Sequence, residues 1–171
     1  CHNPNPNDLY NNGDDNPSDN KNFRRLRAEG IMTADESSPA TFRNAKIINN
    51  IIVGCRRGIT HYGKAKESGL KDILISNNTI IIPNAKGRGE EFVGINIPYN
   101  NGSNTNTVLD NNIIYGFHPE TYLLFLDTAP TLINNNFQGV TFKDNLWYHS
   151  SNTKPFHIGP KWLNIYHTDF K

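Results

Sequence analysis

The chain has 171 residues, 17 basic and 16 acidic side chains, and a formal net charge of +1. Hydrophobic residues make up 36% and charged residues 19%, against about 45–50% and about 25% in typical globular domains, and 27 asparagines fill much of the difference. The composition excludes a membrane span, because no long apolar run exists. It also argues against a nucleic-acid binder held by phosphate contacts and against a disulfide framework or cysteine metal cluster.

Residues 1–29 are rich in Asn, Asp and Pro and are expected to form a loop-rich segment. The chain begins with Cys1 and shows no signal peptide, which leaves a fragment, a processed product and a lipoprotein as alternatives. Within the segment, Asp14, Asp15 and Asp19 form an acidic cluster. Ca²⁺ takes such oxygen ligands, but the spacing matches no EF-hand loop and favours a polar loop. Ca²⁺ is therefore possible as a cofactor, and no metal ligands are assigned.

An asparagine followed by apolar residues recurs four times, at spacings of 28, 34 and 33 residues. Aligning the chain on this Asn produces apolar or small columns five before, three before and two after it, with a mostly polar position between. Such alternation predicts strands with one buried face. The aligned positions are Asn50, Asn78, Asn112 and Asn145; Ala45, Ile73, Thr107 and Val140; Ile47, Ile75, Leu109 and Phe142; and Ile52, Ile80, Ile114 and Trp147.

A second strand recurs in the same order and often begins with Gly-Ile. Its apolar column is predicted to consist of Ile31, Ile59, Ile95, Leu124 and Ile158. His61 falls in the inward column beside Thr33, so a satisfied and partly buried histidine is expected there rather than a catalytic one. Cys1 and Cys55 would precede this strand in adjacent repeats, where they could form a disulfide or remain buried thiols.

The segments 73–80 (ILISNNTI) and 109–116 (LDNNIIYG) resemble the repeats of right-handed parallel β-helix proteins, a group that includes pectate-lyase-like polysaccharide lyases and glycoside hydrolases. The resemblance implies an all-β, right-handed parallel β-helix (solenoid) of about four to five rungs. It would form one segment over residues 1–171, with 1–29 as an insertion and both ends inside the solenoid. It also implies a secreted or cell-surface protein with polysaccharide as its partner.

The recurring Asn is expected to act structurally. An asparagine at a corner tolerates the left-handed backbone conformation. Asparagines stacked in register can also bond to one another through their side-chain amides. The apolar columns would stack into one continuous core, each rung contacting only its neighbours.

Function must then come from loops and outward positions. The corner between the Asn and the next Gly-Ile strand varies in length, and its loops should rise side by side as a wall with a local basic bias. Arginine there would grip carboxylates of a uronate polymer, and lyase chemistry would add a neutralising cation and a base. The predicted catalytic residues are Arg57, Arg88 and His118, with Lys86 as another possible base, and the predicted substrate-binding residues are Arg56, Lys86, Glu91, Glu120 and Tyr122.

Three alternatives to lyase chemistry remain open. A glycoside hydrolase would need two facing carboxylates, with Glu90, Glu91, Glu120, Asp35 and Asp127 available. A structural or adhesive rod would bind glycans or surfaces without turnover. The basic bias could also be no more than a solvated, turn-rich edge. Tyr62, Tyr99, Tyr115 and Tyr148 could stack on sugar rings, whereas Trp147 belongs to an apolar column and is predicted to be core.

Overall fold

The computed structural model describes residues 29–35, 42–63, 69–82, 92–97, 104–119, 121–126, 139–151, 155–158 and 166–167. Within these ranges the regular structure consists of strands alone. The predicted insertion up to residue 28, with its acidic cluster and Cys1, lies outside the described residues. No helix that could cross a membrane occurs in the part of the chain that is described.

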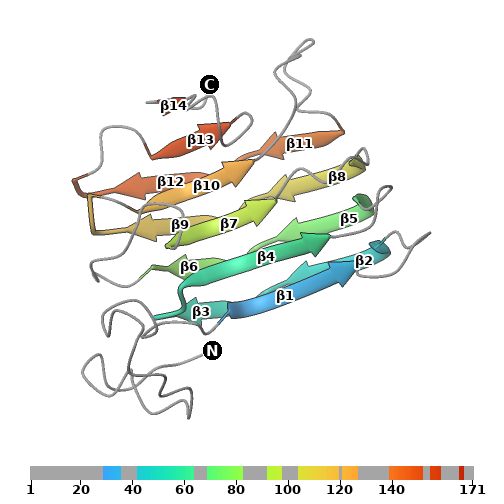
Figure 1. Ribbon diagram of the computed structural model, residues 1–171, viewed down its shortest axis with the longest axis horizontal. Coiled ribbons are helices and arrows are strands. Elements are labelled where there is room, and N and C mark those ends of the chain that lie inside the picture. Colours follow the sequence, from blue (N-terminus) through green and yellow to red (C-terminus); the bar gives the residue numbers. More distant parts are fainter. Residues whose placement is uncertain are drawn as a thin grey trace, which may run out of the picture.

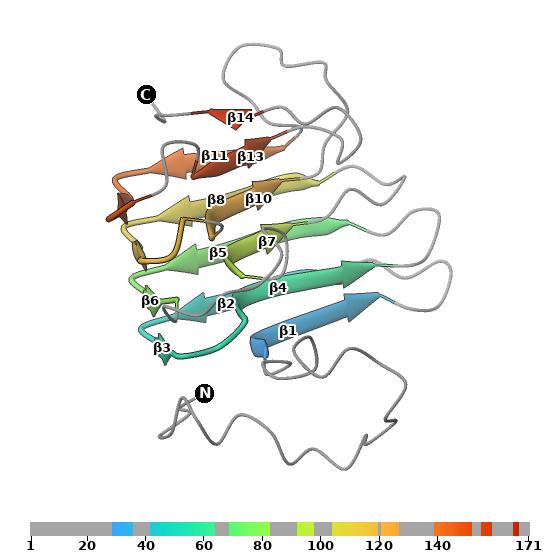
Figure 2. The same cartoon turned by 60° about the vertical axis from the view of Figure 1, so that its left-hand side comes forward.

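The strands coil upward in a right-handed spiral (Figures 1 and 2), and each turn of the spiral contributes one strand to each of three sheets. The pairing is parallel throughout except for the last strand, which pairs antiparallel. The described residues form four complete rungs and the start of a fifth, which confirms the predicted all-β parallel β-helix.

We name the sheets by their extent. The long sheet has the order β1 (Glu29–Asp35), β4 (Arg57–Gly63), β7 (Val93–Ile97), β10 (Tyr122–Leu126), β13 (Phe156–Ile158) and β14 (Tyr166–His167). The middle sheet holds β2 (Phe42–Ile48), β5 (Leu70–Ser76), β8 (Thr105–Asp110) and β11 (Val140–Lys143). The short sheet holds β3 (Ile51–Val53), β6 (Thr79–Ile81), β9 (Ile113–Gly116) and β12 (Leu146–His149).

The strand registers confirm the predicted columns of the middle and short sheets. Ile47 pairs with Ile75 and Ile75 with Leu109, and the next partner is Phe142. The column two residues after the asparagine, which ends at Trp147, is also in register. Together these columns form a continuous core, and Trp147 packs against it as predicted.

The long sheet confirms its column with one correction. Ile31, Ile59, Ile95 and Leu124 are in register, but the fifth partner is Phe156 and not Ile158, which pairs with Leu126. The slip is two residues, so it leaves the same face of the strand buried. Aligning on the apolar type alone could not detect it.

At the corner between the middle and short sheets, two adjacent residues have different roles: one takes the left-handed backbone conformation and the next forms the side-chain ladder. The left-handed conformation falls on the residue before the predicted asparagine, with φ between 48° and 58° at Asn49, Asn77, Asn111 and Asp144. The prediction that the recurring Asn itself would take this conformation is therefore wrong. Asn and Asp are the non-glycine residues that tolerate it best. A second left-handed column runs through the middle sheet at Asn44, Asp72, Asn106 and Gly139.

The recurring asparagines form the predicted ladder. The Asn50, Asn78 and Asn112 side-chain nitrogens each donate to the side-chain oxygen of the next asparagine, at 2.9, 2.9 and 2.8 Å. Asn112 also donates to the Ile75 carbonyl and accepts from the Asn78 backbone N–H. All four hydrogen-bonding positions of the buried Asn112 amide are thereby used.

Candidate functional site

The corner that leads from the short sheet into the long sheet carries the predicted site. Arg56 lies in the turn before β4 and Arg57 is the first residue of β4. The Arg56 carbonyl accepts a hydrogen bond from the Val93 backbone N–H at 3.0 Å, which ties this turn to the rung above. Two rungs above Arg57, Tyr122 starts β10 in the same register column, reached through Val93. With strands about 4.8 Å apart, the two Cα atoms are roughly 10 Å apart.

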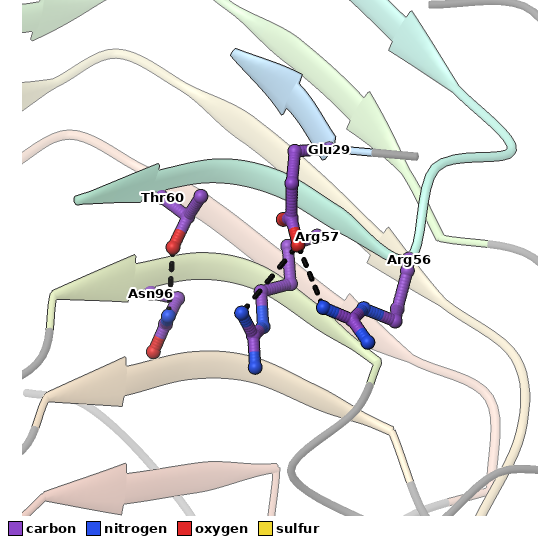
Figure 3. Close-up of polar contacts among 5 residues, drawn as sticks. All are labelled: Glu29, Arg56, Arg57, Thr60 and Asn96. Carbon is purple, nitrogen blue, oxygen red and sulfur yellow. Dashed lines mark hydrogen bonds and ion pairs between the residues drawn. The ribbon is translucent and has the colours of Figure 1, made fainter. Parts of the chain in front are cut away.

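Both arginines converge on Glu29, the first residue of β1 (Figure 3). Arg56 Nη2 lies 2.8 Å and Arg57 Nη1 lies 3.4 Å from the same carboxylate oxygen, Glu29 Oε1. The three side chains are 15% exposed for Glu29, 23% for Arg56 and 29% for Arg57. We call these three residues the arginine pair and its carboxylate.

This cluster is only partly satisfied. Glu29 Oε2 and Arg56 Nε are buried polar atoms without a hydrogen-bond partner. Two guanidinium groups also face this one carboxylate. A buried, incompletely paired network of this kind costs stability, typically about 1–3 kcal/mol for each orphaned group. Two guanidinium groups beside a donor without a partner, Arg56 Nε, are features expected of an anion site.

Further along the long sheet lies an outward column of polar and aromatic residues. Asn96 Nδ2 donates to Thr60 Oγ1 at 2.7 Å between β7 and β4 (Figure 3). In the next rungs Phe125 and His157 follow in register, with their rings packed edge to face at 4.5 Å. These four are buried, and so is Val93 in the column of Arg57. The solvent-exposed parts of the long sheet are therefore separated by buried residues, and the arginine pair is one of these exposed parts.

His118 lies in the turn that precedes β10, at the same corner as Arg56 but two rungs higher. Its carbonyl accepts from the Thr121 backbone N–H at 2.9 Å. Next to it His149 covers Gly116, whose added Cβ would come within 2.8 Å of the imidazole ring. His149 Nδ1 accepts from the Ser151 backbone N–H at 3.1 Å, so this nitrogen carries no proton.

Burial lowers the pKa of His149 below its ordinary value of 6.5. Hydrogen bonds with the backbone of His118 and Thr121 act in the opposite direction, and the charge of His118 adds to the lowering. The neutral imidazole of His149 thus links β12 to the turn below it through these hydrogen bonds. This arrangement makes His149 a structural residue at the corner where a base was predicted.

The outer face of the short sheet is apolar. Tyr115 and Tyr148 stack on one another with ring centroids 4.6 Å apart. Partial desolvation and the neighbouring Tyr148 phenol raise the pKa of the Tyr115 hydroxyl. Ile51 and Leu146 are exposed in the adjoining column. Tyr115 and Tyr148 are two of the tyrosines predicted to stack on sugar rings, and each has one ring face covered by the other.

Several predicted residues are not placed. Of the predicted site residues, the structure brings Arg56 and Arg57 together and sets His118 and Tyr122 at the same corner. Lys86, Arg88, Glu91 and Glu120 lie outside the described residues, as do Glu90, Asp127 and Tyr99, and the side chain of Asp35 is not described. The roles predicted for them stay predictions.

His61 and Cys55 can be assigned. His61 is buried, as predicted, and its Nδ1 lies 2.9 Å from Thr33 Oγ1. Cys55 is a buried thiol whose pKa is raised by burial. A thiol in such surroundings is unreactive, and its predicted counterpart Cys1 lies outside the described residues.

Sequence reasoning missed Glu29 as a member of the site because it was placed at the end of the N-terminal insertion. A signal was present: Glu29 precedes Gly30 as Arg57 precedes Gly58, and the two are partners in the register. Thr60 and Asn96 were also missed. They are outward positions between recognised columns, and their bond depends on the stacking of β4 on β7.

The arrangement can bind an anion at the arginine pair. Among the described residues no three His, Cys, Asp or Glu side chains converge to hold a metal ion. No family model, curated protein or solved structure matches this chain.

Proposed function

We propose that this protein binds an acidic polysaccharide at the corner of the long sheet, as a secreted or cell-surface β-helix. The observation that carries the proposal is the arginine pair, two partly exposed guanidinium groups sharing one oxygen of one carboxylate. Guanidinium and carboxylate match in shape and pair bidentately. A uronate carboxylate is therefore a ligand of matching charge and shape for the arginine pair.

The rod geometry supports a polymer over a small ligand. Rungs stack at a regular spacing, so side chains of one column recur along the axis. Tyr122 lies in the column of Arg57, two rungs above it and beyond the covered Val93. A chain of sugars with its carboxylate on the arginine pair could thus reach an aromatic ring at a second open point.

Depolymerisation is the stronger form of the proposal. In a lyase reaction Arg57 would neutralise the uronate carboxylate and lower the cost of removing the adjacent proton. His118, at the same corner, would be the base. The competing proposal is a structural rod without turnover. It is supported by the asparagine ladder, in which the Asn78 and Asn112 amides use all their hydrogen-bonding positions within the rod.

The test is binding of a polyuronate by calorimetry, with ultraviolet absorbance at the same time to detect unsaturated products. Replacing Arg57 by Gln (Arg57→Gln) should weaken binding at least tenfold, since removing one partner of a charged hydrogen bond costs about 1.5–3 kcal/mol. Lys46→Gln, an exposed lysine of the middle sheet, is the matched control and should change little. Equal binding by both variants would contradict the proposal. Binding without absorbance change, in a protein that folds cooperatively, would support the rod.

A further inference from the structure

We infer that the outer face of the short sheet is a self-association surface, on which a second copy of this chain packs face to face. The surface consists of the outward side chains of Ile51, Ile113, Leu146, Tyr115 and Tyr148, which we call the apolar ridge. Arg57 and Glu29 belong to the long sheet, so the inference goes beyond the proposed function and does not rest on it.

The first argument is the exposure of the apolar ridge. The exposed fractions are high for large apolar side chains, at 77% for Ile51, 58% for Leu146, 48% for Tyr148 and 43% for Ile113. Together these four side chains present roughly 450 Å² of surface, which equals the largest apolar patch of a typical monomer. With strands about 4.8 Å apart, the column from Ile51 to Leu146 runs about 14 Å along the rod. Continuous apolar patches of this size mark interaction surfaces.

The second argument is the absence of charge. The four strands of the short sheet, β3, β6, β9 and β12, contain no Asp, Glu, Lys or Arg. Their one histidine, His149, lies against Gly116, and burial lowers its pKa, so it is uncharged at neutral pH. The outer face of the middle sheet, by contrast, carries exposed charges at Arg43, Lys46 and Lys143. The apolar ridge therefore offers a charged partner nothing to pair with.

The third argument is symmetry, and it favours a second copy as the partner. In a two-fold interface a patch faces its own copy, so each charge on it would meet a like charge. A patch without charges avoids this repulsion. The outer faces of two sheets can pack about 10 Å apart with interdigitating side chains, as the inner faces of a β-sandwich do. The apolar ridge thus meets the electrostatic condition for pairing with itself.

The shape of the column also suits such a pairing. Thr79 lies between Ile51 and Ile113 in the register and is the smallest side chain of the column. A two-fold axis between β6 and β9 would set Ile113 of each copy against this smaller residue of the other. Both copies of Ile113 then lie close to the axis, where a substitution acts twice within one interface.

The expected affinity follows from the size of the interface. A standard interface buries about 800 Å² on each partner, with an apolar core and a polar rim. The apolar ridge would supply the core, and the exposed Asn77 and Asn111 along one border would belong to the rim. We therefore expect association in the micromolar range, the weak end for interfaces of this size.

The experiment measures molar mass by sedimentation equilibrium between about 1 and 100 µM protein. The unaltered protein should pass from monomer to dimer and keep its dissociation constant in 0.5 M salt, because no ion pairs hold the ridge. Ile113→Lys places two like charges near the axis and should weaken the dimer at least tenfold. Ile48→Lys is the matched control. Ile48 is 42% exposed on the outer face of the middle sheet, and its substitution should change the dissociation constant less than twofold.

A mixture sharpens the test. Ile113→Lys and Ile113→Glu should each be monomeric alone and dimeric when mixed, because opposite charges then meet near the axis. No recovery in the mixture would overturn the inference. If these variants fail to unfold cooperatively, Leu146→Lys, at a more exposed position of the same column, should weaken the dimer in their place.

Three further results would also overturn the inference: a monomer at every concentration, equal effects of Ile48→Lys and Ile113→Lys, or a monomer that binds a neutral oligoglucan and loses this binding in Ile113→Lys. The last result would assign the apolar ridge to sugar stacking. Polyuronate binding at the arginine pair should persist in Ile113→Lys at low protein concentration, so this inference and the proposed function can fail separately.

Discussion

The corner that leads into the short sheet and the corner that leads out of it differ in how regularly their polar residues repeat and in how completely these residues are hydrogen-bonded. At the corner from the middle sheet, one asparagine repeats in four rungs, and the Asn78 and Asn112 amides are completely bonded. At the corner into the long sheet, successive rungs carry Arg57, Val93 and Tyr122 in one column. That corner also holds Glu29 Oε2 and Arg56 Nε, which are buried without hydrogen-bond partners.

The difference separates a corner that stabilises the fold from a corner that carries the proposed binding site. A repeated polar residue satisfies itself only when its neighbours above and below are the same, so the ladder corner gains from uniformity. At the long-sheet corner the residue type changes from rung to rung and hydrogen bonding is less complete, which is common at functional sites. The predictions below test this contrast, from the largest expected effect to the smallest.

Breaking the ladder should have the largest effect. Asn112→Ala removes four side-chain hydrogen bonds and leaves the Ile75 carbonyl and the Asn78 amide groups buried without partners. We expect a loss of about 3 kcal/mol or more in the free energy of unfolding, measured with urea. Asn111→Gly, on the neighbouring left-handed and exposed residue, should lose under about 1 kcal/mol. Similar losses for both variants would contradict the ladder's role.

Crowding the start of a long-sheet strand should have the next largest effect. A Cβ at Gly94 would lie 2.5 Å from Ile114 Cγ2 and 2.6 Å from the Leu123 carbonyl oxygen. Gly94→Ala should therefore cost about 2 kcal/mol by overpacking. A double-mutant cycle with Ile114→Ala tests the cause: the cost should fall in that background but persist in part, because the Leu123 carbonyl remains. Purely additive costs would contradict the clash.

Removing the Glu29 carboxylate should lower the free energy of unfolding by less than the two changes above. Glu29→Gln leaves two guanidinium groups facing an amide, and for a partly exposed pair we expect a loss of about 1 kcal/mol. The loss should shrink in 0.5 M salt, because added ions screen the repulsion that remains. Asn112→Ala should show no such salt dependence. A salt-independent Glu29→Gln difference would mean that the carboxylate acts through packing.

The smallest effect is expected from pH. Because the pKa of His149 is lowered in the folded protein, the unfolded chain binds more protons below its ordinary value of 6.5. The contribution is thus complete above about pH 7 and is lost as pH falls from there toward the folded-state pKa. The slope of unfolding free energy between pH 7 and 5 should be smaller in His149→Gln than in the unaltered protein. An unchanged slope would assign the dependence to other groups.

The fold could be predicted because its signal is repeated. A residue such as Ile75 has counterparts at Ile47 and Leu109, and three agreeing positions define a column where one would not. The prediction slipped by two residues at Ile158, where the apolar residue two places earlier, Phe156, also fits the pattern. It slipped by one in assigning the left-handed backbone, because Asn49 and Asn50 are the same residue type with different tasks.

The site could be predicted only in part because it does not repeat. Arg56 and Arg57 stood out as a charged pair beside a Gly-Ile strand, but their partner comes from another rung, 27 and 28 residues earlier. Finding Glu29 required the register and the side-chain directions together. His149 illustrates the same limit: its neutral state depends on burial against Gly116, which sequence does not display.

The ladder has one more property that its geometry imposes. Every bond between its side chains runs in the same sense, from Asn50 to Asn78 to Asn112 to Asn145. The amide dipoles therefore add along the axis, and each polarises the next. The formal net charge of +1 does not express this property: the ladder carries a dipole along the axis of the rungs, and its positive and negative ends are different.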